Sequence, residues 1–191
     1  MPRVLKIVMS MSDSSIDCPS SDLRNMGSNP LLSRHRISNV HLKDGSPNWK
    51  KDSTTALRGA YALVIHLKQP GQLTIGHLGQ QQFSSGFYIY AGSALGSGGI
   101  QARVQRHLRY TRAKAPHWHV DRLLAVGKII EVWWKPGTQS LECTWAARLT
   151  TIGSIHIPGF GASDCRCPGH LVRFKNRDEI SAGFRLLRSH D

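Results

Sequence analysis

Apolar segments with alternating side chains constrain the fold of this chain most strongly. Ala60 to Leu67 is rich in β-branched and apolar residues and is followed by a Pro-Gly turn, which predicts a strand. A second strand, Gln72 to Ile75, follows, and Gly86 to Ala91 is expected to form a third, in which Tyr88 and Tyr90 share one face. These short consecutive strands indicate a small antiparallel sheet.

The hydrophobic period changes to about four residues after the third strand. Ile100, Val104 and Leu108 recur at this spacing, which is typical of an amphipathic helix that packs on a sheet. Arg103 and His107 lie one turn apart on a neighbouring face of the same helix.

Another strand is predicted at Ile129 to Trp134, before a second Pro-Gly turn, and an edge strand at His170 to Phe174. Between them, residues 141–149 have the apolar spacing of a helix, which Thr138 or Ser140 would cap. We therefore predict an α/β (α+β) fold with a small, mainly antiparallel central sheet flanked by helices.

The domain boundaries follow from composition. Residues 1–54 are rich in Ser, Asn, Asp and Pro and show no sustained apolar period, so they should form a disordered or loosely attached N-terminal extension. The 191 residues suffice for one domain with its own core. We place this domain at residues 55–180 and expect a C-terminal tail at 181–191.

The charge of the chain indicates its partner class. The net charge is +13, and from Leu57 onward 17 Lys and Arg residues stand against 7 Asp and Glu. This excess favours nucleic acid, with an anionic membrane surface as the rival. The four cysteines do not suggest a disulfide scaffold, and no apolar run is long enough to span a bilayer or typical of a signal peptide, so we expect a cytoplasmic protein.

Two triads, Gly59-Ala60-Tyr61 and Tyr90-Ala91-Gly92, accompany the predicted strands, ahead of the helix with Arg103 and His107. Hydrolysis of a phosphodiester needs a group that activates the nucleophile, cations where charge develops on phosphate, and usually a divalent metal on a carboxylate. The chain offers all three. Glu142 is our candidate carboxylate, with Asp164 in reserve.

These residues resemble the GIY-YIG nuclease superfamily, with Ala60 and Ala91 in place of two isoleucines. After the second triad, the matching positions are Ser93, Arg103 and His107. The chain is most similar to a branch of small proteins, sometimes fused to endonuclease III-type glycosylases, that carry a His-Trp-His segment and an Asp-Cys-x-Cys-Pro segment. It differs from the wider superfamily in the greater length of the segment between the triads and of the loop after the second.

The resemblance implies a role for each residue of the site. The Tyr90 hydroxyl would orient or deprotonate the attacking water, and Tyr61 would hold this water or the scissile phosphate. Arg103 would stabilise phosphate charge, His107 would contact phosphate or shuttle a proton, and Glu142 would hold Mg²⁺ or Mn²⁺. The structural alternatives are half-buried core tyrosines, a solvated arginine, a buried histidine and a glutamate favoured by the helix dipole.

Further residues are predicted to contact nucleic acid around this site. They are Ser93, Arg106, Arg109, Arg112, His117, Trp118 and His119. Trp118 would stack on an unpaired base, whereas the arginines could equally form an ordinary solvated face. The Gly-rich loop from Gly92 to Gly99 offers backbone N–H groups to phosphate, or serves only as a connector.

The cysteines admit a metal site. Cys165, Cys167 and His170, together with His117 and His119, contain enough soft ligands for a tetrahedral Zn²⁺. Two cysteines separated by one residue chelate less commonly than two separated by two, and reduced, buried cysteines are the alternative.

We therefore predict a Mg²⁺-dependent endonuclease that acts on DNA rather than RNA, structure-specific and connected with repair, without membrane association. Two other classes stay open. The chain could be a non-catalytic module that binds nucleic acid, or a zinc-stabilised RNA-processing factor.

Overall fold

A computed structural model describes residues 5–8, 57–110 and 115–189. Its strands are β1 (Leu5–Val8), β2 (Gly59–Leu67), β3 (Gly71–Thr74), β4 (Gln80–Phe83), β5 (Gly86–Ala94), β6 (Lys128–Pro136), β7 (Ser154–Ile155) and β8 (Leu171–Phe174). Its helices are the short 3₁₀ helix η1 (Gly76–Leu78), then α1 (Gly99–Leu108), α2 (His119–Leu124), α3 (Glu142–Leu149) and α4 (Arg177–Arg188).

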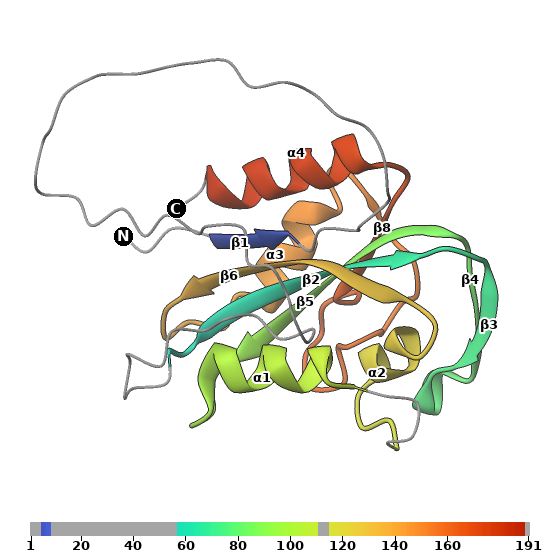
Figure 1. The fold of residues 1–191 in the computed structure, drawn as a ribbon, viewed down its shortest axis with the longest axis horizontal. Coiled ribbons are helices and arrows are strands. Elements are labelled where there is room, and N and C mark those ends of the chain that lie inside the picture. The colour runs from blue at the N-terminus through green and yellow to red at the C-terminus, as the bar shows by residue number, and fades with distance from the viewer. Residues whose placement is uncertain (1–4, 9–56, 111–114, 190–191) are drawn as a thin grey trace, which may run out of the picture.

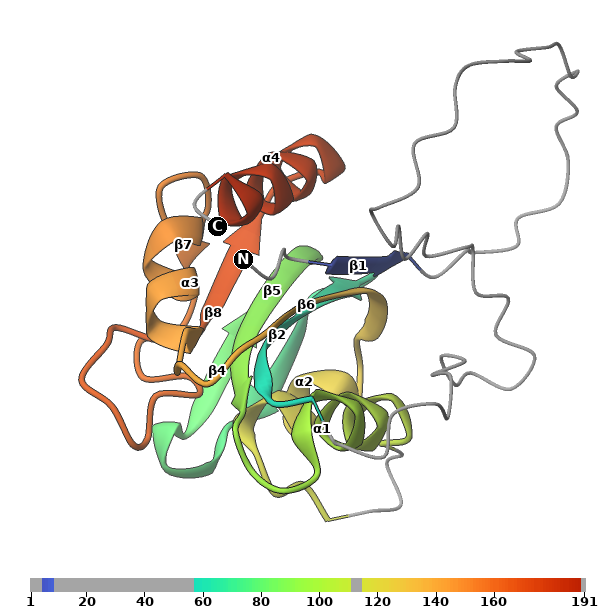
Figure 2. The ribbon, with the colours of Figure 1, turned by 90° about the vertical axis from the view of Figure 1, so that its left-hand side faces the viewer.

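The elements form three layers. Six strands make one antiparallel sheet in the order β1-β6-β2-β5-β8-β7, and β3 and β4 form a separate hairpin at its side. Helices α1 and α2 cover one face of the large sheet, and α3 and α4 cover the other (Figure 1, Figure 2). The predicted fold class is confirmed.

The central strand β2 is buried on both faces, which divides the apolar residues into two cores. Its odd-numbered residues from Tyr61 to Leu67 join the core beneath α1 and α2. Its even-numbered residues Ala60, Ala62 and Val64 join the core beneath α3 and α4. A strand with helices on both faces explains why this segment is apolar at nearly every position.

The predicted strands are found, with two corrections. The strand predicted at Gly86 to Ala91 continues to Ala94 because its last residues still pair with the start of β2. The strand predicted at the sheet edge, β8, has a neighbour on each side because Ser154 and Ile155 pair with it. The long segment between the two triads folds as the β3–β4 hairpin, of which sequence indicated only the first strand.

The prediction that Thr138 or Ser140 caps the helix after β6 is wrong. The N-cap position of α3 is Leu141, without a side-chain hydrogen bond, and the Ser140 hydroxyl instead donates to Glu142 Oε1 at 2.7 Å. Helices α2 and α4 were not predicted. None of the helices in the described part of the chain is long and apolar enough to cross a membrane.

Both predicted boundaries of the domain need correction where the structure describes them. Residues 5–8, assigned to the loose N-terminal extension, form edge strand β1 on β6, whereas residues 9–56 lie outside the described residues. The predicted boundary at residue 180 falls inside α4. This helix continues because Gly183 and Leu187 pack into the core beneath α3 and α4, so residues 181–188 are not a tail.

Leu187→Ala is therefore expected to lower the free energy of unfolding by about 2–5 kcal/mol, because the Leu187 side chain is fully buried. Urea denaturation would measure the loss. Arg185→Ala, at an exposed position of the same helix, should change stability by less than about 0.5 kcal/mol. Equal effects of the two substitutions would contradict the docking of α4.

Candidate active site and metal-binding cluster

The two triads lie side by side because β2 pairs with β5. Tyr61 is opposite Gly92 and Leu63 is opposite Tyr90, so the tyrosines are diagonal neighbours on the face covered by α1 and α2. A Cβ on Gly92 would lie 2.5 Å from Tyr61 Cζ. The glycine of the second triad therefore makes room for the tyrosine of the first.

His107 reaches this pair from α1. Its Nε2 lies 3.0 Å from the Tyr61 hydroxyl, and both side chains are buried. Burial raises the pKa of Tyr61 well above its ordinary value, with Tyr90 adding to the rise and Arg103 opposing it. Burial also lowers the pKa of His107. Near neutral pH the pair is therefore a phenol and a neutral imidazole.

Asp121, in α2, is a buried acid that the sequence analysis missed. Its carboxylate accepts two hydrogen bonds from the Arg106 guanidinium, at 2.9 and 3.3 Å, and one from each backbone N–H of His117 and Trp118, at 2.9 and 3.0 Å. Although burial acts to raise its pKa, the interactions with His107, Arg106 and these N–H groups hold the pKa well below the ordinary value. Asp121 is thus an ionised carboxylate in the interior.

Arg106 and Trp118 are engaged within the protein. The Arg106 guanidinium lies 3.6 Å from the centre of the Trp118 ring while it pairs with Asp121, and the Arg103 guanidinium lies 4.4 Å from the same ring. Arg106 is therefore not the freely solvated cation that the sequence suggested. The partly exposed Trp118 ring packs against two guanidinium groups.

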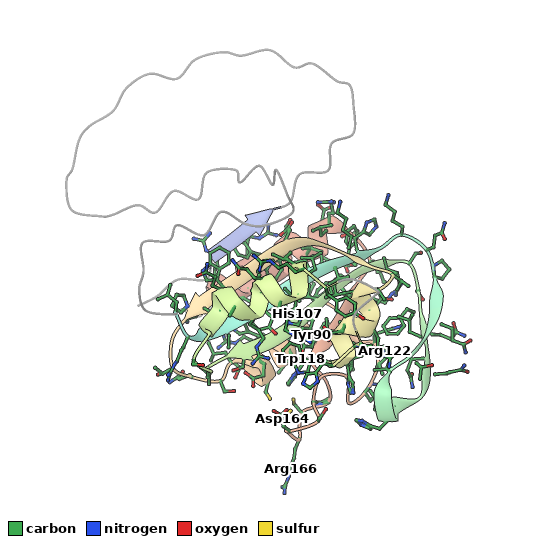
Figure 3. The ribbon with its side chains drawn as sticks, turned by 60° about the horizontal axis from the view of Figure 1, so that its bottom comes forward. Tyr90, His107, Trp118, Arg122, Asp164 and Arg166 are labelled. Carbon is green, nitrogen blue, oxygen red and sulfur yellow. The ribbon has the colours of Figure 1, made fainter. Side chains whose placement is uncertain are left out.

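Tyr90 lies where cationic and acidic groups converge. Burial raises its pKa; the Arg103 charge opposes this shift, and Asp164, Asp121 and Glu142 add to it. Figure 3 shows Tyr90, His107 and Trp118 gathered beneath α1, with Asp164 on the loop that projects from the same side. Both candidate carboxylates, Glu142 and Asp164, are therefore near enough to act on Tyr90.

Glu142 is held at the first turn of α3. Its Oε1 accepts from Ser140, whereas its Oε2 is buried and has no hydrogen-bond partner among the described residues. A carboxylate oxygen that is buried without a protein donor needs a water molecule or a cation as its partner. The donor set of this residue therefore fits a divalent ion.

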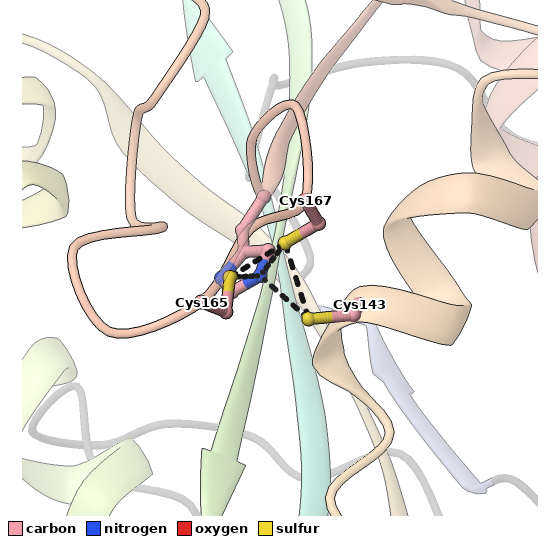
Figure 4. A group of neighbouring side chains, drawn as sticks. Cys143, Cys165 and Cys167 are labelled. Carbon is pink, nitrogen blue, oxygen red and sulfur yellow. Dashed lines mark hydrogen bonds between the residues drawn. The ribbon is translucent and has the colours of Figure 1, made fainter.

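Four side chains form a metal-binding cluster beside Glu142. They are Cys143 at the start of α3, Cys165 and Cys167 in the loop before β8, and His170 at the end of that loop (Figure 4). Their Sγ and Nε2 atoms all lie within 4.8 Å of one another, and neighbouring pairs are 2.7–3.5 Å apart. This Cys₃His cluster can hold a metal ion.

The predicted ligand set for this cluster was partly wrong. Cys143, which sequence did not connect with the other cysteines, is a member, whereas His117 and His119 are not. His119 Nδ1 instead accepts the Gly161 backbone N–H at 3.1 Å, and His117 is exposed.

The loop that carries Cys165 and Cys167 also covers Tyr90. A Cβ on Gly161 would lie 2.7 Å from Tyr90 Cε2, and the His170 carbonyl accepts the Ala91 backbone N–H at 3.0 Å. The metal-binding cluster and the tyrosine pair are therefore parts of one connected structure.

The remaining residues predicted to contact nucleic acid differ in their exposure. Ser93 is half-buried in β5, Arg109 is exposed at the end of α1, and Arg112 lies outside the described residues. Two exposed arginines that sequence did not single out, Arg122 of α2 and Arg166 of the cluster loop, lie on the side shown in Figure 3. They add positive charge to this side.

Part of the Gly-rich loop and of the helix start that follows it is already engaged within the protein. The backbone N–H groups of Gly99, Ile100 and Ala102 donate within the protein, at 3.0, 2.7 and 3.3 Å, to carbonyl groups of the preceding segments. These three amides are therefore occupied, which favours the reading of the loop as a connector.

Gly92→Ala should lower the free energy of unfolding by about 1–3 kcal/mol, because the added methyl group would overlap the Tyr61 ring. Thermal unfolding monitored by circular dichroism would detect this. Gly96→Ala is a matched control, since no atom lies within 4 Å of a Cβ built there. An unchanged melting temperature for Gly92→Ala would show that Tyr61 can leave its place across the strand.

Comparison with known proteins identifies a family. Residues 60–189 match the family described as a domain of unknown function, DUF123. Comparisons with curated proteins and with solved structures gave no match. The matched region spans more than half of the chain and includes all of the two triads except Gly59, together with α1, α2 and the whole Cys₃His cluster. The chain therefore belongs to the DUF123 family.

Proposed function

We propose that this protein is a divalent-metal-dependent endonuclease that hydrolyses phosphodiester bonds in DNA. The observation that carries this proposal is the convergence of two tyrosines, a buried histidine, an arginine and two carboxylates at one end of the sheet. This set matches the GIY-YIG-like pattern of the sequence, and nuclease activity at branched or damaged DNA is the function that this resemblance suggests.

Arg103 is suited to stabilise the phosphate. Its guanidinium is fixed over the Trp118 ring, and its charge acts on Tyr61, Tyr90 and His107 together. A planar guanidinium can bind two phosphate oxygens at once and stays charged at any working pH. Arg103 would therefore neutralise the charge that grows on phosphate during attack.

Tyr61 and His107 are suited to remove the proton of the attacking water. Because the pKa of Tyr61 is raised, this residue cannot act as a stored phenolate. As water attacks phosphorus, the water proton passes to the Tyr61 oxygen while the Tyr61 proton passes to His107 Nε2. The P–O bond to the leaving oxygen breaks, and that oxygen takes a proton from solvent. Tyr90 orients the water.

Glu142, with Asp164 nearby, would hold Mg²⁺ or Mn²⁺. Such an ion supplies positive charge to the phosphate and to the leaving oxygen. The unpaired Oε2 of Glu142 supports this assignment.

The partner follows from charge. A polyanion is expected for a chain of net charge +13, and exposed Arg109, Arg122 and Arg166 offer contacts to the DNA backbone. We propose a cytoplasmic location.

The alternatives are a binding module without turnover and an RNA-processing factor. A cleavage panel of labelled duplex, flap and single-stranded DNA and RNA separates them from the proposal.

Glu142→Gln should reduce the cleavage rate at saturating DNA by about 10²-fold or more while DNA binding changes only a few-fold, because the shape is kept and the charge that holds the cation is lost. Cleavage would be measured with Mg²⁺ and binding by fluorescence anisotropy in EDTA. Asp178→Asn, which removes one exposed carboxylate from the first turn of α4, is the control. Full cleavage by Glu142→Gln would place the cation elsewhere.

We further propose that the Cys₃His cluster binds Zn²⁺. Three thiol groups and one imidazole are a common zinc donor set, and tetrahedral ligand atoms at about 2.1–2.3 Å from zinc lie about 3.5–3.8 Å apart. Three of the distances here, 2.7, 2.9 and 3.1 Å, are shorter, so these pairs of ligand atoms would separate by about 1 Å or less on binding. Burial raises the pKa of the Cys143 and Cys167 thiols, an effect that a bound cation would reverse.

Cys143→Ser should abolish stoichiometric zinc, because it removes the ligand that joins α3 to the loop. Elemental analysis would show about one zinc per wild-type chain, and replacement by Co²⁺ should give the thiolate charge-transfer and d–d absorption bands of a tetrahedral site. Cys18→Ser, which changes the cysteine outside the cluster, should keep the metal. Purified wild-type protein that neither contains nor takes up zinc would refute the assignment.

A further inference from the structure

Asp121 is a fully buried charged group that the proposed reaction does not use. It is held by Arg106 from α1 and by the N–H groups of His117 and Trp118, so its carboxylate has little freedom to turn. Its Oδ1 lies 3.7 Å from His107 Nδ1. The carboxylate therefore faces the ring nitrogen that points away from Tyr61.

The two ring nitrogens of His107 face different groups, the Tyr61 hydroxyl and the Asp121 carboxylate. Its Nε2 meets the Tyr61 hydroxyl at 3.0 Å, and its Nδ1 is buried without a hydrogen-bond partner among the described residues. In a neutral imidazole, one nitrogen carries the proton and the other accepts. A lone pair on Nδ1 would face an ionised carboxylate, which is repulsive in a buried place, whereas an N–H at Nδ1 would be attracted to it.

We propose that Asp121 is a positioning residue that keeps the His107 proton on Nδ1, so that Nε2 stays free to take the proton of Tyr61. The separation of 3.7 Å is longer than a hydrogen bond, so Asp121 acts on the Nδ1 proton as a nearby buried charge. Catalytic hydrogen bonds are often long before substrate binds. The expected effect on the cleavage rate rests on the proposed nuclease function. The position of the proton on His107 does not depend on that function.

The charges around His107 allow the sign of a pH effect to be worked out. The charged groups that act on it are Asp121 of α2 and Arg103 and Arg106 of α1, and Tyr61 of β2 is its hydrogen-bond partner. Burial lowers the pKa of His107 most, Asp121 raises it, and the two arginines lower it. Because the neutral imidazole is the proton acceptor, cleavage should fall as pH drops through the pKa of His107, below about 6.5.

The tautomer can be read without any cleavage assay. Long-range ¹H–¹⁵N correlation spectra distinguish Nδ1–H from Nε2–H in each histidine, and His107→Gln identifies the signals of His107. The wild-type protein at neutral pH should show Nδ1–H. A wild-type Nε2–H form would overturn the proposal, even if the Asp121 variant does not fold.

Two variants separate positioning from anchoring of α2. Asp121→Asn should reduce the cleavage rate at saturating DNA by about 10²-fold or more, leave DNA affinity within a few-fold, and move the acidic limb of the pH profile to lower pH. Arg106→Gln removes the same ion pair but keeps the carboxylate. It should keep the Nδ1–H form and move the acidic limb to higher pH.

Each outcome decides one point. Equal rate losses in both variants, with unchanged tautomer and unchanged acidic limbs, would show that Asp121 only anchors α2 and would overturn the proposal. If the wild-type protein cleaves no substrate, the proposed function fails, while the tautomer in the wild-type protein and in Asp121→Asn still decides whether Asp121 controls His107.

Discussion

The register of β2 against β5 is the constraint on which the rest of the structure depends. Each residue of β2 has a partner in β5, so a slip of one residue would turn Tyr61 towards α3 and α4. Both faces of this pair are covered, which means that packing on either side opposes such a slip. The small residues of the triads serve this packing: Gly92 leaves space for the Tyr61 ring, and Ala60 and Ala91 lie in the core on the opposite face.

Sequence predicted the fold where local periodicity and tertiary packing agree. The strands β2, β5 and β6 and the helix α1 each have a clear apolar period, and the structure contains all of them. Helix α4 carried a signal that was overlooked. The Asn176 side chain accepts the Glu179 backbone N–H, and Glu179 accepts the Lys175 N–H, a pattern close to a capping box. The strand β4 is mostly glutamine, so no apolar period marks it.

The parts of the site that sequence missed are long-range. Cys143 stands 22 positions before Cys165, too far for a local motif, and only the packing of α3 beside the last loop joins them. Asp121 follows the His-Trp-His segment, which drew attention to aromatic and imidazole groups rather than to the acid. Its scarcity could have revealed it, because the chain has only 7 Asp and Glu residues from Leu57 onward, and this one directly precedes Arg122 within a short apolar segment.

The two ends of the site differ in charge, and this difference bears on what each end can bind. With zinc bound, three thiolates and a neutral imidazole would carry a net charge of about −1, beside Glu142 and Asp164. This end would attract a divalent cation rather than phosphate. Arg103, in contrast, stands over Trp118 at the end where Asp121 already neutralises Arg106. Because Asp121 pairs with Arg106, Arg103 is the cation beside the tyrosines that has no carboxylate paired with it among the described residues. In the proposed reaction, phosphate would lie between Arg103 and the acidic end.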